Sequence, residues 1–238
     1  MVDAAYLILA FPLLGFLLLV AFGRRLGEPL AGWLATAAMA LSFLATVAAF
    51  GQLVALEGHD RHVTKDLFTW IEAGGLEVEA ALLVDQLSIT MALFITGVGT
   101  LIHLYSIGYM QGDRAYPRFF TYLNLFALSM LVLVLSDNFL FTFLGWEGVG
   151  MCSYLLISFW FEREQAASAG KKAFVVNRVG DVGFLLAIFL LFGAFGSLRY
   201  EEVFEGLGGA SHVTVTAIAL LLFLGACGKS AQLPLFVW

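Results

Sequence analysis

Glu147 is the one formally charged residue between Phe139 and Phe161, in a run that is otherwise apolar or uncharged. Such a run can cross the roughly 30 Å hydrocarbon core of a bilayer. At about 1.5 Å per residue, Glu147 would lie some 13 Å below its start, near mid-membrane. A carboxylate at that depth is unfavourable unless it is paired or protonated, so the position predicts a proton-relay residue. The alternative is a Glu that bonds a neighbouring helix only for packing.

Three further charged residues fall within later apolar runs, namely Arg178, Asp181 and Lys229, and with Glu147 their charges sum to zero. Arg178 and Asp181 are three residues apart on one helix face and can pair, either as an internal ion pair or as participants in proton transfer. Lys229 has no partner within its own helix. Because burial disfavours the charge of both lysine and glutamate, we predict that Glu147 and Lys229 form the central proton-exchanging couple.

Two other residues are weaker candidates. His103 could take up a proton near neutrality, yet a lone His near the end of a span is also typical of a hydrogen-bonded packing residue. Pro234 follows Gly225 and Gly228 and offers no backbone N–H, which predicts a break in the seventh apolar run. Broken helices at membrane depth usually line a cavity.

Nothing in the sequence indicates a metal or cofactor site. Cys152 and Cys227 lie in apolar runs without Cys-x-x-Cys or Cys/His spacing, so we expect no disulfide, zinc, haem or iron–sulfur site. The residues Gly228-Lys229-Ser230 resemble the end of a P-loop, but Phe223 stands where its first Gly would be. We therefore expect no bound cofactor in this chain and no nucleic-acid partner.

Composition defines the class of protein. Of the 238 residues, 61% are hydrophobic and 13% charged, whereas soluble domains carry about 25% charge. We predict an all-α polytopic membrane protein in a lipid bilayer, with about seven transmembrane helices. Residues 1–81 would hold two spans and an acidic loop folded as a small hairpin, and residues 82–238 the start of a second domain. The predicted spans are Ala4–Phe22, Leu30–Leu56, Leu82–Ile107, Phe119–Leu135, Phe139–Phe161, Ala173–Phe195 and Val213 onward.

Basic residues predict the orientation of the chain. Seven Lys and Arg residues follow spans one, three and five, and three lie in the other connections. Since connections rich in Lys and Arg remain cytoplasmic, the N-terminus and the loop Glu57–Glu79 should face outward. The first run lacks a basic segment before it, so it is a span and not a cleavable signal peptide.

Four motifs carry a family resemblance, namely residues 101–110 (LIHLYSIGYM), 145–150 (GWEGVG), 172–181 (KAFVVNRVGD) and 228–235 (GKSAQLPL). In this order they resemble the subunit L family, the antiporter-like membrane subunits of proton-pumping NADH-quinone oxidoreductase, or respiratory complex I. The resemblance implies inverted five-helix repeats with a broken helix in each, and a row of buried charges across the membrane. Glu147 and Lys229 match the family's relay glutamate and lysine, and Arg178 and Asp181 match its supporting pair.

The resemblance also implies partners and a location. It predicts proton translocation coupled to quinone reduction by NADH, in a bacterial inner membrane, beside other membrane-arm subunits. Flavin, iron–sulfur clusters, NADH and quinone would be bound in partner subunits. Since the family continues past span seven, we expect the 238 residues to be the N-terminal part of a longer protein, with the antiporter-like helical repeat truncated. A Mrp-type sodium/proton antiporter subunit is the alternative function, and a purely structural membrane scaffold is a third hypothesis.

Overall fold

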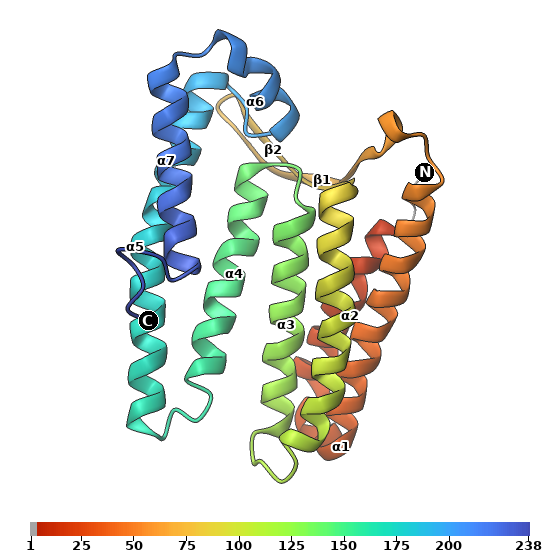
Figure 1. Cartoon of the computed structure of the whole chain (residues 1–238). Coiled ribbons are helices and arrows are strands. Elements are labelled where there is room, and N and C mark those ends of the chain that lie inside the picture. The colour runs from red at the N-terminus through yellow and green to blue at the C-terminus, as the bar shows by residue number, and fades with distance from the viewer. Residues whose placement is uncertain (1–3) are drawn as a thin grey trace. The chain divides into compact units, whose positions relative to one another are not determined.

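The computed structural model describes residues 4–238 as a set of apolar helices with one β-hairpin (Figure 1). Six of its helices are long and apolar enough to cross a membrane. In chain order the elements are α1 (Ala5–Val54), a 3-10 turn (Gly58–Asp60), β1 (His62–Ala73), β2 (Leu76–Asp85), α2 (Gln86–Tyr109), α3 (Tyr116–Leu135), α4 (Phe139–Ile157), α5 (Glu164–Phe195), α6 (Tyr200–Gly206), a second 3-10 turn (Leu207–Gly209) and α7 (His212–Lys229).

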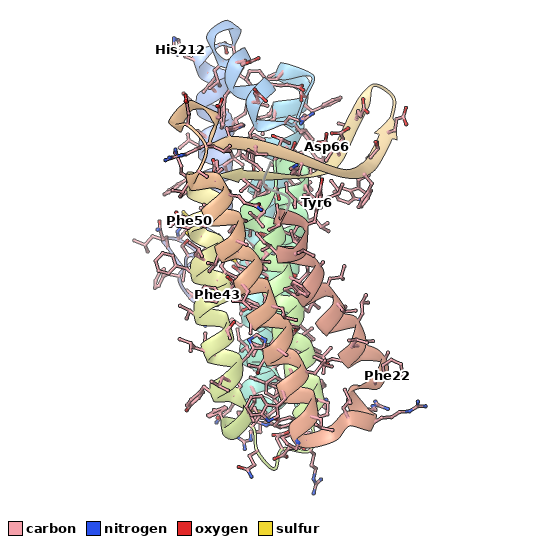
Figure 2. The ribbon with its side chains drawn as sticks, turned by 90° about the vertical axis from the view of Figure 1, so that its right-hand side faces the viewer. Tyr6, Phe22, Phe43, Phe50, Asp66 and His212 are labelled. Carbon is pink, nitrogen blue, oxygen red and sulfur yellow. The ribbon has the colours of Figure 1, made fainter. Side chains whose placement is uncertain are left out.

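Helix α1 consists of two antiparallel legs. Its 50 residues include a break at Gly27 and Glu28, whose backbone angles are not helical, and the chain reverses there. The Ser42 hydroxyl donates to the Ile8 carbonyl at 2.7 Å, which fixes the returning leg against the first. Figure 2 labels Phe22 near this reversal. Two legs plus five further long helices make seven spans, and the predicted number is confirmed.

The predicted start of the third span at Leu82 is wrong, because β2 continues to Asp85 and α2 begins at Gln86. Leu82 and Val84 are fully buried strand residues, and a short apolar run of this kind cannot be told from a helix by hydropathy. Asp85 then caps α2: its carboxylate accepts from the Ser88 backbone N–H at 2.7 Å, and the Ser88 hydroxyl accepts from the Asp85 N–H at 2.9 Å.

The predicted hairpin is present, although it extends further than the acidic loop Glu57–Glu79. Strands β1 and β2 pair with each other in a two-stranded sheet. They are joined at Gly74 and Gly75, whose φ angles of 58° and 87° place both in the left-handed region. A two-residue turn of this type matches the twist of paired strands and favours glycine at both positions.

The chain divides into two compact units. The first combines the residues up to Lys65 with Leu82–Leu135, and the second combines Asp66–Ala81 with Ser136–Trp238. In the first unit, α2 and α3 both pack against α1. In the second, α5 packs against α4 and α7. The predicted division after residue 81 separates the first two spans and the loop from the start of the second domain. It does not refer to these compact units, and it stays a prediction.

The second unit has its own apolar core between α4, α5, α6, α7 and the hairpin. Phe184, Ala187, Ile188 and Leu191 recur at helical spacing on one face of α5 and are each at most 5% exposed. Helix α5 begins at Glu164, earlier than the predicted Ala173, and its first turns contain the polar and basic residues before the apolar stretch. The helix is therefore longer than its apolar stretch alone predicts.

Candidate functional site

Four charged side chains from three helices meet in the second unit, and we call them the charged row. Glu147 belongs to α4, Arg178 and Asp181 to α5, and Lys229 is the last residue of α7. Arg178 Nη1 donates to Glu147 Oε2, and the same nitrogen lies 3.6 Å from Asp181 Oδ2. Lys229 Nζ lies 3.9 Å from Asp181 Oδ2. The charges thus alternate in sign along Glu147, Arg178, Asp181 and Lys229.

The predicted direct couple of Glu147 and Lys229 needs correction. Arg178 lies between them and contacts Glu147, while the partner of Lys229 is Asp181. The physical reason is the length of the Arg178 side chain and its position on α5. Arg178 stands on the middle helix of the three, and its long guanidinium fork can approach carboxylates on two sides. The role of Glu147 and Lys229 as relay residues stays a proposal.

Burial differs along the charged row. The Asp181 side chain is 2% exposed and that of Lys229 17%, whereas Glu147 and Arg178 are 27% and 36% exposed. Every member of the row has a buried atom that makes no hydrogen bond within residues 4–238, namely Glu147 Oε1, Arg178 Nε, Asp181 Oδ2 and Lys229 Nζ. The row therefore retains hydrogen-bonding capacity for further groups along its whole length.

Trp146 is a member of this site that the sequence reasoning missed. Its indole Nε1–H donates to Asp181 Oδ1 at 2.6 Å, so the two oxygens of Asp181 serve different neighbours. Its ring also lies 5.7 Å from Lys229 Nζ, within the range of a cation–π contact. The sequence did contain a signal for Trp146. A Trp at membrane depth needs an acceptor for its indole N–H, and this one is the neighbour of Glu147 in the sequence.

Two glycines make room for the charged row. A side chain at Gly180 would place its Cβ 3.0 Å from the Gly228 Cα and 3.1 Å from the Leu224 carbonyl oxygen, so α5 and α7 touch backbone to backbone there. This close approach brings Lys229 to Asp181. On α4, a Cβ at Gly150 would collide with Lys229 Nζ. Small residues commonly permit such contacts between membrane helices.

His103 lies in the first unit and does not belong to the charged row. It is 2% exposed, and its Nδ1 lies 2.7 Å from the Gly99 carbonyl oxygen. Its Nε2 lies 3.1 Å from the Asn124 amide nitrogen on α3. A donating amide requires Nε2 to accept and Nδ1 to donate, so both ring nitrogens are used by the neutral imidazole. This geometry favours the packing interpretation.

Pro234 lies beyond the end of α7, which stops at Lys229. Ala231 has a φ of 49°, and the Gln232 N–H bonds back to the Cys227 carbonyl at 3.0 Å. The Trp238 indole then donates to the Gly228 carbonyl at 2.9 Å. Regular helix therefore ends before the proline, directly after the residue that contributes the last charge of the row.

A second charged group, the Arg199 cluster, was not recognised from the sequence. It consists of Asp66, Glu79, Asp137 and Arg199. The guanidinium lies 3.2 Å from Asp137 Oδ2, 3.7 Å from Glu79 Oε2 and 3.9 Å from Asp66 Oδ1. Its members come from β1, β2, the turn before α4 and the segment before α6, so only the folded chain brings them together. Three carboxylates face one guanidinium.

Asn138 connects this cluster to α4. Its side-chain oxygen accepts from the Phe141 N–H at 2.8 Å and caps the helix, while its amide donates to the Glu79 carbonyl at 2.8 Å. Burial raises the pKa of Asp137 against the opposing effects of the Asn138 hydrogen bond and Arg199. Burial, and next the Asp66 carboxylate, raise the pKa of Glu79. The pKa of each of these two carboxyls is therefore raised although the Arg199 guanidinium lowers it.

No group of three His, Cys, Asp or Glu side chains that could hold a metal ion is found among the residues described here, 4–238. Cys152 and Cys227 are both reduced and buried. The location of redox cofactors in partner subunits stays a proposal.

Two family models match the chain. One, described as NADH:quinone oxidoreductase/Mrp antiporter, TM, matches residues 136–238, which include the charged row. The other, NADH-Ubiquinone oxidoreductase (complex I), chain 5 N-terminus, matches residues 70–120. Together they cover parts of both compact units.

Similar proteins agree with these matches. NADH-quinone oxidoreductase subunit L of Mycobacterium tuberculosis (strain CDC 1551 / Oshkosh) is 48% identical over 233 residues, which are 98% of this chain and 37% of that protein. Subunit L of Neisseria meningitidis serogroup A / serotype 4A (strain DSM 15465 / Z2491) is 43% identical over 247 residues, 98% and 36% of the two chains. The chain thus spans little more than a third of these relatives.

The fold is similar to that of a chain in the Mrp complex from Dietzia sp. DQ12-45-1b, with a TM-score of 0.78 and 25% identity over 99% of this chain and 24% of that one. The antiporter-like architecture expected from the four motifs is confirmed.

Proposed function

Because the chain belongs to the subunit L family of antiporter-like membrane proteins, we propose that it is the N-terminal part of a proton-translocating subunit of NADH:quinone oxidoreductase. The observation that carries the proposal is the charged row. Four ionisable side chains of alternating sign lie together within apolar helices that are long enough to span a membrane. A helix bundle that serves only as a scaffold does not need such a group, because apolar side chains of similar volume pack there at lower cost.

The proposed role of the row is to move charge through Arg178. One guanidinium nitrogen reaches both Glu147 and Asp181. Unit charges about 4 Å apart attract by roughly 4 kcal/mol at an effective dielectric of 20, so a shift of Arg178 between the two carboxylates changes which of them is stabilised as an anion. When Arg178 moves toward Asp181, Glu147 loses its counter-ion and takes up a proton. The same movement weakens the hold of Asp181 on the Lys229 ammonium, and reversal restores the row.

We also propose the cellular setting. The chain would lie in a bacterial inner membrane with its N-terminus outward, beside other membrane-arm subunits, and NADH, flavin, iron–sulfur clusters and quinone would be bound in partner subunits. One contact supports the topology within the second unit. The hairpin, the turn before α4 and the segment before α6 meet in the Arg199 cluster, and these are the second, fourth and sixth connections, which alternate spanning requires to share a side.

The test uses the full complex in inverted membrane vesicles. Glu147→Gln and Lys229→Met remove the charges at the two ends of the row at nearly constant volume. Each should lower the ratio of protons taken up to NADH oxidised, in membranes with equal amounts of assembled complex. Matched controls are Glu164→Gln and Lys171→Met, because both residues are exposed at the start of α5. If both row variants have the wild-type ratio of protons taken up to NADH oxidised, Glu147 and Lys229 have only a structural role.

A Mrp-type antiporter subunit is the second candidate, favoured by the fold similarity to the Dietzia Mrp complex. Identity to that chain is 25%, whereas identity to a subunit L protein is 48%. The two functions differ in coupling. A Mrp-type subunit should exchange sodium for protons without NADH, so radioactive sodium uptake driven by a pH gradient distinguishes them.

A further inference from the structure

An apolar segment separates the charged row from the Arg199 cluster on two neighbouring helices. Along α4, Asp137 precedes the helix and Glu147 lies about 15 Å further on, with Leu140 and Phe143 between them in contact with the apolar core. Along α5, Asp181 and Arg199 are separated by the buried core residues of that helix. The same order of charge, apolar core and charge therefore occurs on both helices.

Phe184 stands at the end of this segment nearest the charged row. Its ring makes edge contacts with Phe143, at 5.3 Å between centroids, and with Trp146, at 5.1 Å. Phe184 is 5% exposed, and a Cβ at Gly225 of α7 would lie 3.2 Å from the Phe184 Cβ. Three helices thus close around one aromatic ring.

Polar groups lie along α4 before and after Phe143, whose ring contacts Phe184. On one side the Trp146 N–H binds Asp181 of the row. On the other, the Thr142 hydroxyl is hydrogen-bonded to the hydroxyl of Tyr200, whose backbone N–H donates to the Asp137 carbonyl at 3.0 Å. A proton crosses protein interiors along water or polar groups, and an apolar, closely packed region stays dry. Hydrophobic constrictions in channels block conduction for this reason.

We propose that Phe184, packed between Phe143 and Trp146, is the seal that prevents protons from passing between the charged row and the Arg199 cluster. This inference rests on the proposed function, because a barrier at this position matters only when the row carries protons. The seal forces protons on the row to leave by another route. Its loss connects Trp146 and Glu147 to the hydroxyl pair of Thr142 and Tyr200.

The test measures passive proton conductance of vesicles that contain the full complex, in the absence of NADH. Phe184→Gln places a polar, hydratable side chain in the ring's position and should raise the conductance several-fold while the proton-to-NADH ratio falls. Phe184→Leu keeps the segment apolar and should restore wild-type conductance. Phe189→Gln is the matched control, because Phe189 lies on the same helix and is 60% exposed. A purely structural role of Phe184 would reduce assembly without raising conductance per assembled complex.

A second substitution keeps the proposal testable if the Phe184→Gln complex does not assemble. Phe143→Gln alters the same contact from α4 and should also raise conductance. If either variant assembles and its proton conductance equals that of the wild type, the proposed seal is wrong. The double variant Phe184→Gln with Glu147→Gln separates this inference from the proposed function. A leak abolished by Glu147→Gln supports both, whereas a leak that persists supports the seal and removes Glu147 from the proton path.

Discussion

Lys229 Nζ lies 3.9 Å from Asp181 Oδ2, and Arg178 Nη1 lies 3.6 Å from the same oxygen. One carboxylate oxygen therefore faces two cations, while the other accepts the Trp146 N–H. Asp181, together with Arg178 on the same helix, therefore links Glu147 of α4 to Lys229 of α7. Because groups in one such network share partners, the effects of changing them singly should not add.

Removal of Arg178 should damage the complex more than neutralisation of Asp181. Arg178→Ala leaves two carboxylates, Glu147 and Asp181, without their guanidinium, and breaking a buried pair destabilises by about 3–5 kcal/mol. The partial exposure of Arg178 places the expected effect at the lower end. Asp181→Asn retains an oxygen for the Trp146 N–H and leaves Arg178 on Glu147. The amount of intact complex in membranes, resolved on native gels, checks this order, and equal amounts would contradict it.

The sequence was sufficient to predict the number of membrane spans and the four charged residues of the row. An apolar run of membrane length and a charge within it are local properties, so Glu147 and Lys229 could be found by position alone. The contact between Arg178 and Asp181 was also within reach, since three residues on a helix set their spacing.

The pairing between helices could not be predicted. Whether Glu147 meets Arg178 or Lys229 depends on how α4, α5 and α7 are rotated and shifted against one another, and the contact at Gly180 and Gly228 sets the α5–α7 part of that arrangement. The Arg199 cluster joins Asp66 to Asp137 across a long stretch of sequence and gives no periodic signal. Leu82 was misassigned because buried strand and membrane helix share the same hydropathy.

Accessibility of the hairpin decides the proposed orientation. Thr69 lies on β1 and is exposed, whereas the native thiols Cys152 and Cys227 are 0% and 4% exposed and should give little background. A single new thiol, Thr69→Cys, should react with a membrane-impermeant maleimide in intact cells. Arg24→Cys, in the first connection, should react only after the cells are opened. The reverse pattern would invert the topology.

The close approach of α5 and α7 predicts opposite effects for two glycines on the same helix. Gly180→Ala places a methyl group 3.0 Å from the Gly228 Cα, and overpacking of this kind costs about 1–3 kcal/mol. Gly193→Ala meets no atom within 4 Å and should be neutral or stabilising by up to about 1 kcal/mol, since Ala favours helix over Gly. Thermal unfolding of the detergent-solubilised protein compares them.

Gly180→Ala should also lower the proton-to-NADH ratio, because a displaced α7 moves Lys229 from Asp181. Gly193→Ala provides the control for both measurements. Loss of stability in the two variants alike would mean that the contact at Gly180 has no special role.

The Arg199 cluster predicts a pH dependence of stability. Burial chiefly raises the pKa of Asp137 above its ordinary 3.8, with the Asp66 carboxylate adding to this and Asn138 and Arg199 opposing it. A carboxyl with a raised pKa binds its proton more tightly in the folded chain than in the unfolded one. Its stabilising contribution is therefore complete below pH 3.8 and is lost as the pH rises through the folded pKa. Glu79 acts in the same direction from its ordinary 4.5.

Asp137→Asn holds this position neutral at every pH and keeps an oxygen near Arg199. We expect the unfolding free energy of the wild-type protein to fall as the pH rises from about 4 toward neutrality, and that of Asp137→Asn to fall less steeply. Chemical unfolding of the solubilised full-length subunit across this range gives both slopes. Glu72→Gln is the control, because Glu72 is an exposed carboxylate of β1 outside the cluster, and its slope should equal that of the wild type. Parallel slopes for wild type and Asp137→Asn would show that Asp137 gains no proton affinity on folding and that Arg199 outweighs its burial.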